Sequence, residues 1–212
     1  MTGSEFLKLS WNQYLILESD LTKVMRYIAF EENNFKTYSV EFIKQYEPIC
    51  AEIDVLCKLY CQFLEPSSRC ADIMDYADIL LRNRPNIKNA VVLCEELQLK
   101  PWIQWSSDSQ DPRGKNNPLN VSPVWWHDYN KVKHQRLDRD PNGEFWYTHA
   151  NLENVLNALA ALLVVCLNFY KDICINENNP LTVPTQTSEL LKYKDWETNI
   201  IPIFDGGFMQ LY

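Results

Sequence analysis

Four polar residues in the second half of the chain have types and a spacing that suit phosphate chemistry. His134 directly follows Lys133, Arg136 lies two positions further on, and Asn130 precedes His134 by four. Side chains four positions apart share one face of a helix, so Asn130 and His134 are expected to project together. Imidazole transfers protons near neutral pH, and cations stabilise charge on a phosphoryl oxygen. This set of groups is sufficient for RNA cleavage without a metal ion.

We therefore predict a catalytic pair, with His134 moving the proton and Lys133 stabilising charge. Asn130, Arg136 and Tyr129 are the predicted phosphate- or RNA-binding residues. The alternative interpretation is structural. In it Tyr129 belongs to the core, Lys133 and Arg136 form a solvated helix face, and His134 is a satisfied histidine near a helix end.

The cysteines and histidines do not predict a metal site. The seven cysteines are an odd number dispersed along helical patterns, which is typical of free thiols in a reducing cytoplasm. Cys50, Cys57 and Cys61 share one helical face, but no Cys-x-x-Cys and no nearby histidine accompanies them. We predict no metal and no cofactor.

The elements that must position these residues are helices. Apolar residues recur at steps of three and four through most of the chain, and Ser39 and Ser122-Pro123 are suited to helix starts. The predicted helical segments are Tyr14 to Ile28, Phe42 to Phe63, Arg69 to Leu97 with a break at Arg84-Pro85, Trp125 to Val132, and His149 to Ile173.

Two stretches lack this periodicity. Residues 98–124 are rich in turn formers, and an aperiodic loop of this length is more often functional than idle. Residues 176–212 contain prolines, asparagines and a short apolar run, which predicts an extended arm with a short strand pair. We expect an all-α, up-and-down bundle of four to five helices in residues 1–175, with the long loop before a late helix and the arm packed on the bundle.

Composition limits the functional classes. The net charge of −8 counts against a dedicated, high-affinity nucleic-acid binder. Residues 98–140 hold seven lysines and arginines against five acidic residues, so any RNA contact is expected in this region. The longest apolar stretch, Val155 to Leu167, is interrupted by Asn157 and is too short to span a bilayer. We expect a cytoplasmic protein with no membrane contact.

The polar block and the helix after it resemble bacterial HEPN-like helical proteins, among them abortive-infection-type and uncharacterised members. With matching features in the opening segments, the resemblance covers roughly residues 11–173. It rests mainly on Trp125-Trp126-x-x-Tyr129-Asn130-x-x-Lys133-His134-x-Arg136, followed by the helical run Asn151 to Ala160.

The resemblance implies a homodimeric bundle in which polar residues of a late helix meet across the dimer. Many such proteins are metal-independent endoribonucleases that act as toxins or in phage defence, so an RNA substrate and a cognate antitoxin or defence partner are implied. Their signature is an arginine, four to six residues, then a histidine. No arginine lies at that distance before His127, His134 or His149. Only His134, Asn130 and Lys133 match the family's polar block.

Two further expectations concern binding and packing. The second functional hypothesis is a non-catalytic module, in which Trp125, Trp126 and the 98–124 loop recognise a partner protein or a small ligand. Glu52 lies at the edge of an apolar stripe, where a carboxylate needs a partner. We expect it to form an ion pair with Lys133, Arg136 or Arg26, and favour a structural role that fixes the register of the bundle over a role in a site.

Overall fold

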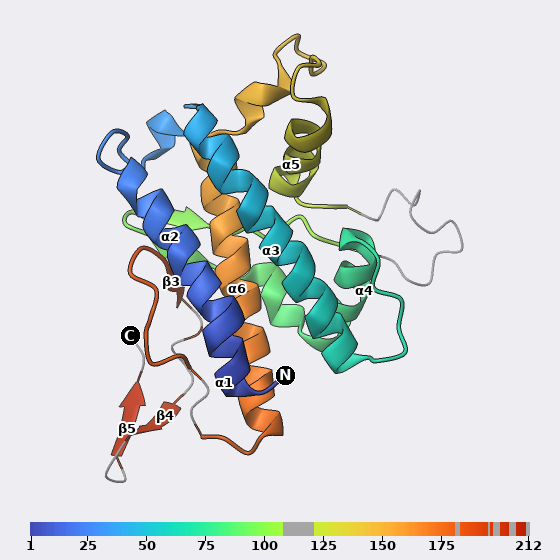
Figure 1. Cartoon of the computed structure of the whole chain (residues 1–212), viewed down its shortest axis with the longest axis vertical. Helices are drawn as coiled ribbons and strands as arrows, with labels where there is room; N and C mark the ends of the chain where they lie inside the picture. Colours follow the sequence, from blue (N-terminus) through green and yellow to red (C-terminus); the bar gives the residue numbers. More distant parts are fainter. Residues whose placement is uncertain (108–120, 181–182, 195, 197–199, 204–206, 211–212) are drawn as a thin grey trace.

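The most apolar segment of the chain forms the central helix, α6 (Leu152–Asn176). The structure is a computed structural model that describes residues 1–107, 121–180, 183–194, 196, 200–203 and 207–210. Asn151 caps α6, because its side chain accepts a hydrogen bond from the Asn154 amide. In Figure 1, α6 lies behind α2 and α3, and it is buried along most of its length.

The remaining helices surround α6. The N-terminal turn α1 (Gly3–Phe6) continues through a π-helical turn (Leu7–Trp11) into α2 (Asn12–Val24). They are followed by α3 (Val40–Leu64), α4 (Ile73–Asn83) and α5 (Val124–Gln135). Short 3-10 turns occupy Glu32–Asn34, Pro85–Asn89 and Trp146–His149.

Helix α3 makes the most extensive packing contact with α6 and also touches α2, α4 and α5. Its predicted cap is confirmed, since the Ser39 hydroxyl accepts a hydrogen bond from the Phe42 amide at 3.1 Å. The helix continues through Pro48 without interruption. The first predicted helix ends earlier than its pattern suggests, because α2 stops at Val24 and the chain turns before Ile28.

The prediction of helix over residues 87–97 is wrong. This segment forms β1 (Val92–Cys94) and the start of β2 (Leu97–Leu99), an antiparallel hairpin. A third strand, β3 (Lys192–Tyr193), pairs with β1 from the C-terminal region, giving the order β2-β1-β3. The fold is therefore mainly α with a small sheet, and not all-α.

The segment after α6 crosses the bundle surface and supplies β3. The Trp11 indole donates a hydrogen bond to the Gln186 carbonyl at 2.8 Å, which ties this segment to the N-terminal helices. Further on, β4 (Ile200–Ile203) and β5 (Gly207–Gln210) form an antiparallel hairpin, which agrees with the expected strand pair. Most of the long loop, residues 108–120, lies outside the described residues.

Candidate functional site

The five predicted site residues all lie on or just after α5, but they do not form one cluster. Tyr129 is buried, with its ring centroid 5.7 Å from that of Tyr46 on α3. Burial raises the pKa of the Tyr129 hydroxyl. The Lys133 ammonium lies 5.5 Å from the centre of the Tyr129 ring, a cation–π contact at the edge of the bundle. The Tyr129 ring therefore packs against the Lys133 side chain and is too buried to contact RNA.

Two of the other predicted residues are engaged in structural contacts. The Asn130 side-chain amide donates to the backbone carbonyl of Trp126, one turn earlier, at 2.9 Å. The Arg136 guanidinium lies 3.2 Å from a carboxylate oxygen of Glu47 on α3. Glu52 has no ion pair within the described ranges, so its expected pairing with Arg136, Lys133 or Arg26 is wrong. The partner of Arg136 is Glu47, five residues earlier on α3.

Lys133 and His134 are exposed at the C-terminal end of α5, as is Gln135 beside them. Within the part of the chain that the structure describes, no hydrogen bond or ion pair involves the His134 ring. A cationic side chain in the last turn also interacts favourably with the helix dipole. The position accordingly fits both the solvated-face interpretation and a site that a second molecule completes.

A denser polar cluster lies on the other side of α5 and was not predicted. Asp128 is 6% exposed. Its Oδ2 accepts a hydrogen bond from the side-chain amide of Asn154 at 3.0 Å and lies 2.8 Å from His149 Nδ1. Its Oδ1 lies 3.1 Å from Nδ1 of His127. One buried carboxylate therefore joins α5, the 3-10 turn before α6, and α6 itself.

His149 also meets a second carboxylate. Its Nε2 lies 3.4 Å from Asp140 Oδ2, in the loop between α5 and α6. Asp140 Oδ1 accepts from the backbone amides of Asn142 and Glu144 at 2.9 and 2.8 Å. Burial acts to raise the pKa of Asp140, but the amide of Glu144, His149 and Asn142 together hold that pKa below its usual value. His149 is thus a bridge between two carboxylates.

This bridge forms one wall of a cleft of about 700 Å³. The cleft lies between the segment before α3, the segment after β2, α5, the 138–144 loop, the 3-10 turn before α6 and the first turns of α6. Most of its lining residues are polar in type, and the lining includes Lys36, Tyr38, Lys100, Gln104, Trp125, Asp128, Asp140, Asn142, Glu144, His149, Asn151, Glu153, Asn154 and Asn157.

Several lining side chains are fixed by their own hydrogen bonds. The Gln104 Oε1 accepts from the Val124 amide at 3.2 Å and so caps α5. The Asn157 side-chain amide donates to the backbone carbonyl of Glu153 at 2.9 Å. The Glu153 carboxylate forms an ion pair with Lys36 at 2.9 Å. The cleft therefore presents amide and carboxylate groups from α5 and α6, together with ammonium and carboxylate groups from loops, which is an arrangement for hydrogen bonding to a polar ligand.

No family model matches this chain, and neither the curated proteins nor the solved structures give a significant match. Assignment of function consequently rests on the site itself.

Two further observations concern other classes of site. Among the described residues, no three His, Cys, Asp or Glu side chains are arranged to hold a metal ion. Helix α6 is long and apolar enough to cross a membrane by length and composition, but most of it is buried inside the bundle, as in the core helix of a soluble protein.

Sequence reasoning missed the Asp128 cluster because its members are distant along the chain. A usable signal was nevertheless present. Asp128 lies three residues after Trp125 and four before Val132, on the stripe assigned to the core. A carboxylate on a buried stripe requires hydrogen-bonding partners, and Asn154 stands on the buried side of the next long helix.

Proposed function

We propose that this protein is a binding module that holds a small polar ligand in the cleft beside Asp128 and His149. The observation that carries the proposal is the combination of a cleft of about 700 Å³ with a wall of mutually hydrogen-bonded polar side chains, in which Asp128 and Asn154 are buried and His149 is half-buried. Ligand sites typically measure about 300–1,000 Å³ and contain a few oriented polar groups. Because Asp128, Asn154 and Asn157 lie on the helices α5 and α6, the ligand meets a preorganised surface on this side of the cleft.

The charges of the cleft favour some ligands over others. Four carboxylates line it, those of Asp128, Asp140, Glu144 and Glu153, against the two ammonium groups of Lys36 and Lys100. This balance disfavours a ligand with many phosphates, such as RNA. A neutral, hydroxyl- or amide-bearing small molecule is the ligand class that the cleft supports best.

The experiment compares two tryptophan substitutions on α6. Asn157 lines the cleft, while Asn168 does not. In both residues, the side-chain amide donates a hydrogen bond to the backbone carbonyl four residues earlier. Asn157→Trp is expected to fill the cleft, with Asn168→Trp as the matched control. Native mass spectrometry of the purified protein, followed by calorimetry with a panel of neutral polyols and amides, measures binding.

The proposal expects a ligand that binds the parent and Asn168→Trp but not Asn157→Trp. Equal binding by both variants would place the ligand elsewhere. If no member of the panel binds the parent and no small molecule copurifies with it, the proposal fails.

A second candidate function, metal-independent RNA cleavage by an HEPN-like dimer, is favoured by the exposed pair Lys133 and His134. In this candidate, His134 of one copy takes the 2'-hydroxyl proton while the 2'-oxygen attacks phosphorus. His134 of the other copy protonates the departing 5'-oxygen, and Lys133 stabilises the phosphoryl charge. The products are a 2',3'-cyclic phosphate and a 5'-hydroxyl end.

This candidate also includes the finer fold assignment, an HEPN-like bundle, and its toxin or phage-defence role with a cognate antitoxin or partner protein. Incubation with mixed structured RNA in EDTA tests it, together with light scattering to measure the oligomeric state. His134→Ala is expected to abolish cleavage, while His127→Ala, at another exposed histidine of α5, is expected to retain it. Cleavage unchanged in His134→Ala would overturn this assignment.

Both candidates are consistent with a cytoplasmic protein, and we propose that location. All seven cysteines are free thiols, and six of them are buried. Burial raises the pKa of Cys50, Cys57 and Cys166 well above the usual value, so these thiols stay protonated and unreactive at neutral pH.

A further inference from the structure

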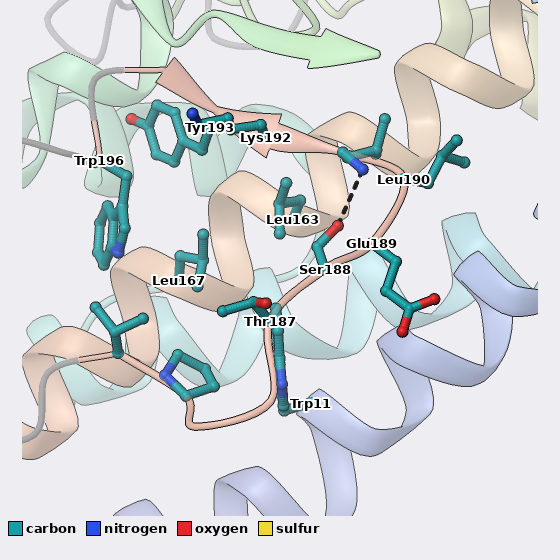
Figure 2. A pocket seen from close by; sticks show the side chains of 13 residues that line it. Trp11, Leu163, Leu167, Thr187, Ser188, Glu189, Leu190, Lys192, Tyr193 and Trp196 are labelled. Carbon is teal, nitrogen blue, oxygen red and sulfur yellow. Dashed lines mark hydrogen bonds between the residues drawn. The ribbon is translucent and has the colours of Figure 1, made fainter. Parts of the chain in front are cut away.

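The segment after α6 partly covers a second cavity, separate from the polar cleft. We refer to residues 183–194 and 196 as the strap. Between the strap and α6 lies a cavity of about 270 Å³. Figure 2 shows Leu163 and Leu167 of α6 facing this space, with Trp196 and Tyr193 to one side and Thr187 and Ser188 to the other.

This pocket is partly open to solvent, since its lining residues Thr187 and Glu189 are exposed. An apolar cavity of about 150 Å³ is already large enough to bind benzene. The space under the strap can therefore hold a molecule with one or two aromatic rings.

The lining identifies the chemistry of that molecule. Leu163, Leu167, Val183 and Leu191 provide apolar contact, and they are buried. Three aromatic side chains, Trp11, Tyr193 and Trp196, complete the walls.

The aromatic walls are themselves held in place by ring contacts. Trp11 stacks on Tyr14 with centroids 4.8 Å apart, and Tyr193 stacks on Trp196 at 5.6 Å. Aromatic rings attract one another at centroid separations of about 4.5–7 Å, so a flat guest between these walls gains contact on more than one side.

Two charged side chains, Glu189 and Lys192, are among the lining residues of this cavity. In Figure 2, the Glu189 carboxylate turns away from Leu163 and Leu167 and towards α2. An ionised guest would lose its hydration among the apolar walls. The guest is consequently expected to be uncharged.

One buried carboxylate holds the strap over the cavity. Glu18 on α2 is 3% exposed and accepts hydrogen bonds from the backbone amides of Glu189 and Leu190, at 3.0 and 3.3 Å. It also accepts from the hydroxyls of Tyr14 and Ser188. Because one wall of the cavity depends on these contacts, Glu18 positions the site without touching the guest.

We propose that the cavity between the strap and α6 is a binding site for a small, uncharged aromatic molecule, and that Glu18 forms the site by fixing the strap. This inference does not depend on the function of the polar cleft. It assigns the C-terminal segment a role in ligand binding that the sequence did not indicate.

The test uses unlabelled indole as the probe and protein labelled with ¹⁵N at the tryptophan side chains. Indole is expected to shift the Nε1 signals of Trp11 and Trp196, which line the cavity. The signals of Trp102 and Trp105, which are buried elsewhere in the core, serve as internal controls and are expected not to shift.

Three variants make the test specific. Thr187→Phe is expected to occupy the cavity and weaken indole binding by roughly tenfold or more. Gln186→Phe, at an exposed neighbour outside the cavity lining, is the matched control and is expected to bind normally. Glu18→Gln retains the size of the side chain but loses the charge that accepts the strap amides, and a similar weakening is expected.

Some outcomes would overturn the proposal. Equal shifts of all tryptophan signals, or no shift at all, would show that indole does not select this cavity. Unchanged binding in Thr187→Phe would place the guest elsewhere. If Thr187→Phe blocks binding but Glu18→Gln does not, the role of Glu18 is wrong. Sodium indole-3-acetate should bind more weakly than indole, and tighter binding would contradict the requirement for an uncharged guest.

Discussion

Nδ1 of His149 lies 2.8 Å from Oδ2 of Asp128, although 21 residues separate the two along the chain. The contact links α5 to the turn that precedes α6, and the Asn154 amide joins it from α6 at 3.0 Å. Asp128 is thus the acceptor that several donors around the cleft share. Removing Asp128 takes one acceptor from each of those donors, although the Asn154 side-chain amide keeps the His149 carbonyl at 2.9 Å. Removing any one donor leaves the others in place.

Asp128→Ala is therefore expected to destabilise the protein by about 2–3 kcal/mol, because buried donors lose a charged acceptor. Urea unfolding followed by circular dichroism measures the change. Asp138→Ala, at an exposed carboxylate just after α5, is the control and is expected to change stability by less than about 0.5 kcal/mol. Equal effects of the two substitutions would show that Asp128 is not central to the cleft.

Helices were predictable from the sequence where one apolar face is buried over several turns. The stripe of α3 and its cap at Ser39 fix that helix locally, and α6 is apolar on nearly all sides. The two strands to which segment 87–97 contributes are too short to show a periodic pattern. Buried positions alternate in β1 and β2, but over three residues a period of two cannot be distinguished from a helical period.

The candidate site was predictable only in part, because its contacts join distant segments. The spacing of Asn130 and His134 correctly indicated a shared helix, but it carried no information on Glu47, the partner that Arg136 finds on α3. Nor does local sequence reveal that Asp128 and His149 meet. That contact depends on how the 138–144 loop returns the chain to α6, which is a tertiary property.

Glu18→Gln is expected to loosen the strap while leaving the bundle folded. The backbone amides of Glu189 and Leu190 both donate to the Glu18 carboxylate. Charged hydrogen bonds are worth about 1.5–3 kcal/mol, so their loss should accelerate hydrogen exchange at these amides on the order of tenfold or more. Exchange measured by NMR tests this, with the exposed Asp20→Asn on the same helix as the control. Unchanged exchange at both amides would contradict the anchoring role of Glu18.

Glu52→Gln is expected to stabilise the protein at neutral pH. Burial raises the pKa of Glu52 above its usual value. The folded state therefore binds the proton more tightly than the unfolded chain, and stability is lost as pH rises through the folded-state pKa. Glutamine removes that loss. The gain in stability of Glu52→Gln over the parent should therefore be absent near pH 4 and reach at most about 1 kcal/mol at pH 7, after allowance for partial exposure.

Urea unfolding as a function of pH measures this gain. Glu41→Gln on the same helix is the opposite case, because the hydrogen bond from Lys44 lowers the pKa of Glu41. Glu41→Gln should lower the stability at pH values above the usual glutamate pKa and have no effect at pH values well below it. If both variants shift stability in the same direction at neutral pH, the proposed desolvation of Glu52 is wrong.

Glu95→Gly is expected to stabilise the β1–β2 hairpin. Glu95 is the first of the two turn residues and has a φ of 50°, in the left-handed region that favours glycine. A residue with a Cβ atom pays roughly 1–2 kcal/mol in this conformation. The flexibility of glycine in the unfolded chain offsets part of that gain, which leaves a net stabilisation of about 0.5–1 kcal/mol.

Glu96→Gly is the matched control, since Glu96 is the second turn residue and has no positive φ. There the same substitution adds only unfolded-state freedom and should destabilise by about 0.5–1 kcal/mol. Both side chains are exposed, so lost packing does not confuse the comparison. Urea unfolding of the two variants should give changes of opposite sign. Destabilisation by Glu95→Gly would show that the turn does not impose the left-handed conformation that separates this hairpin from the predicted helix.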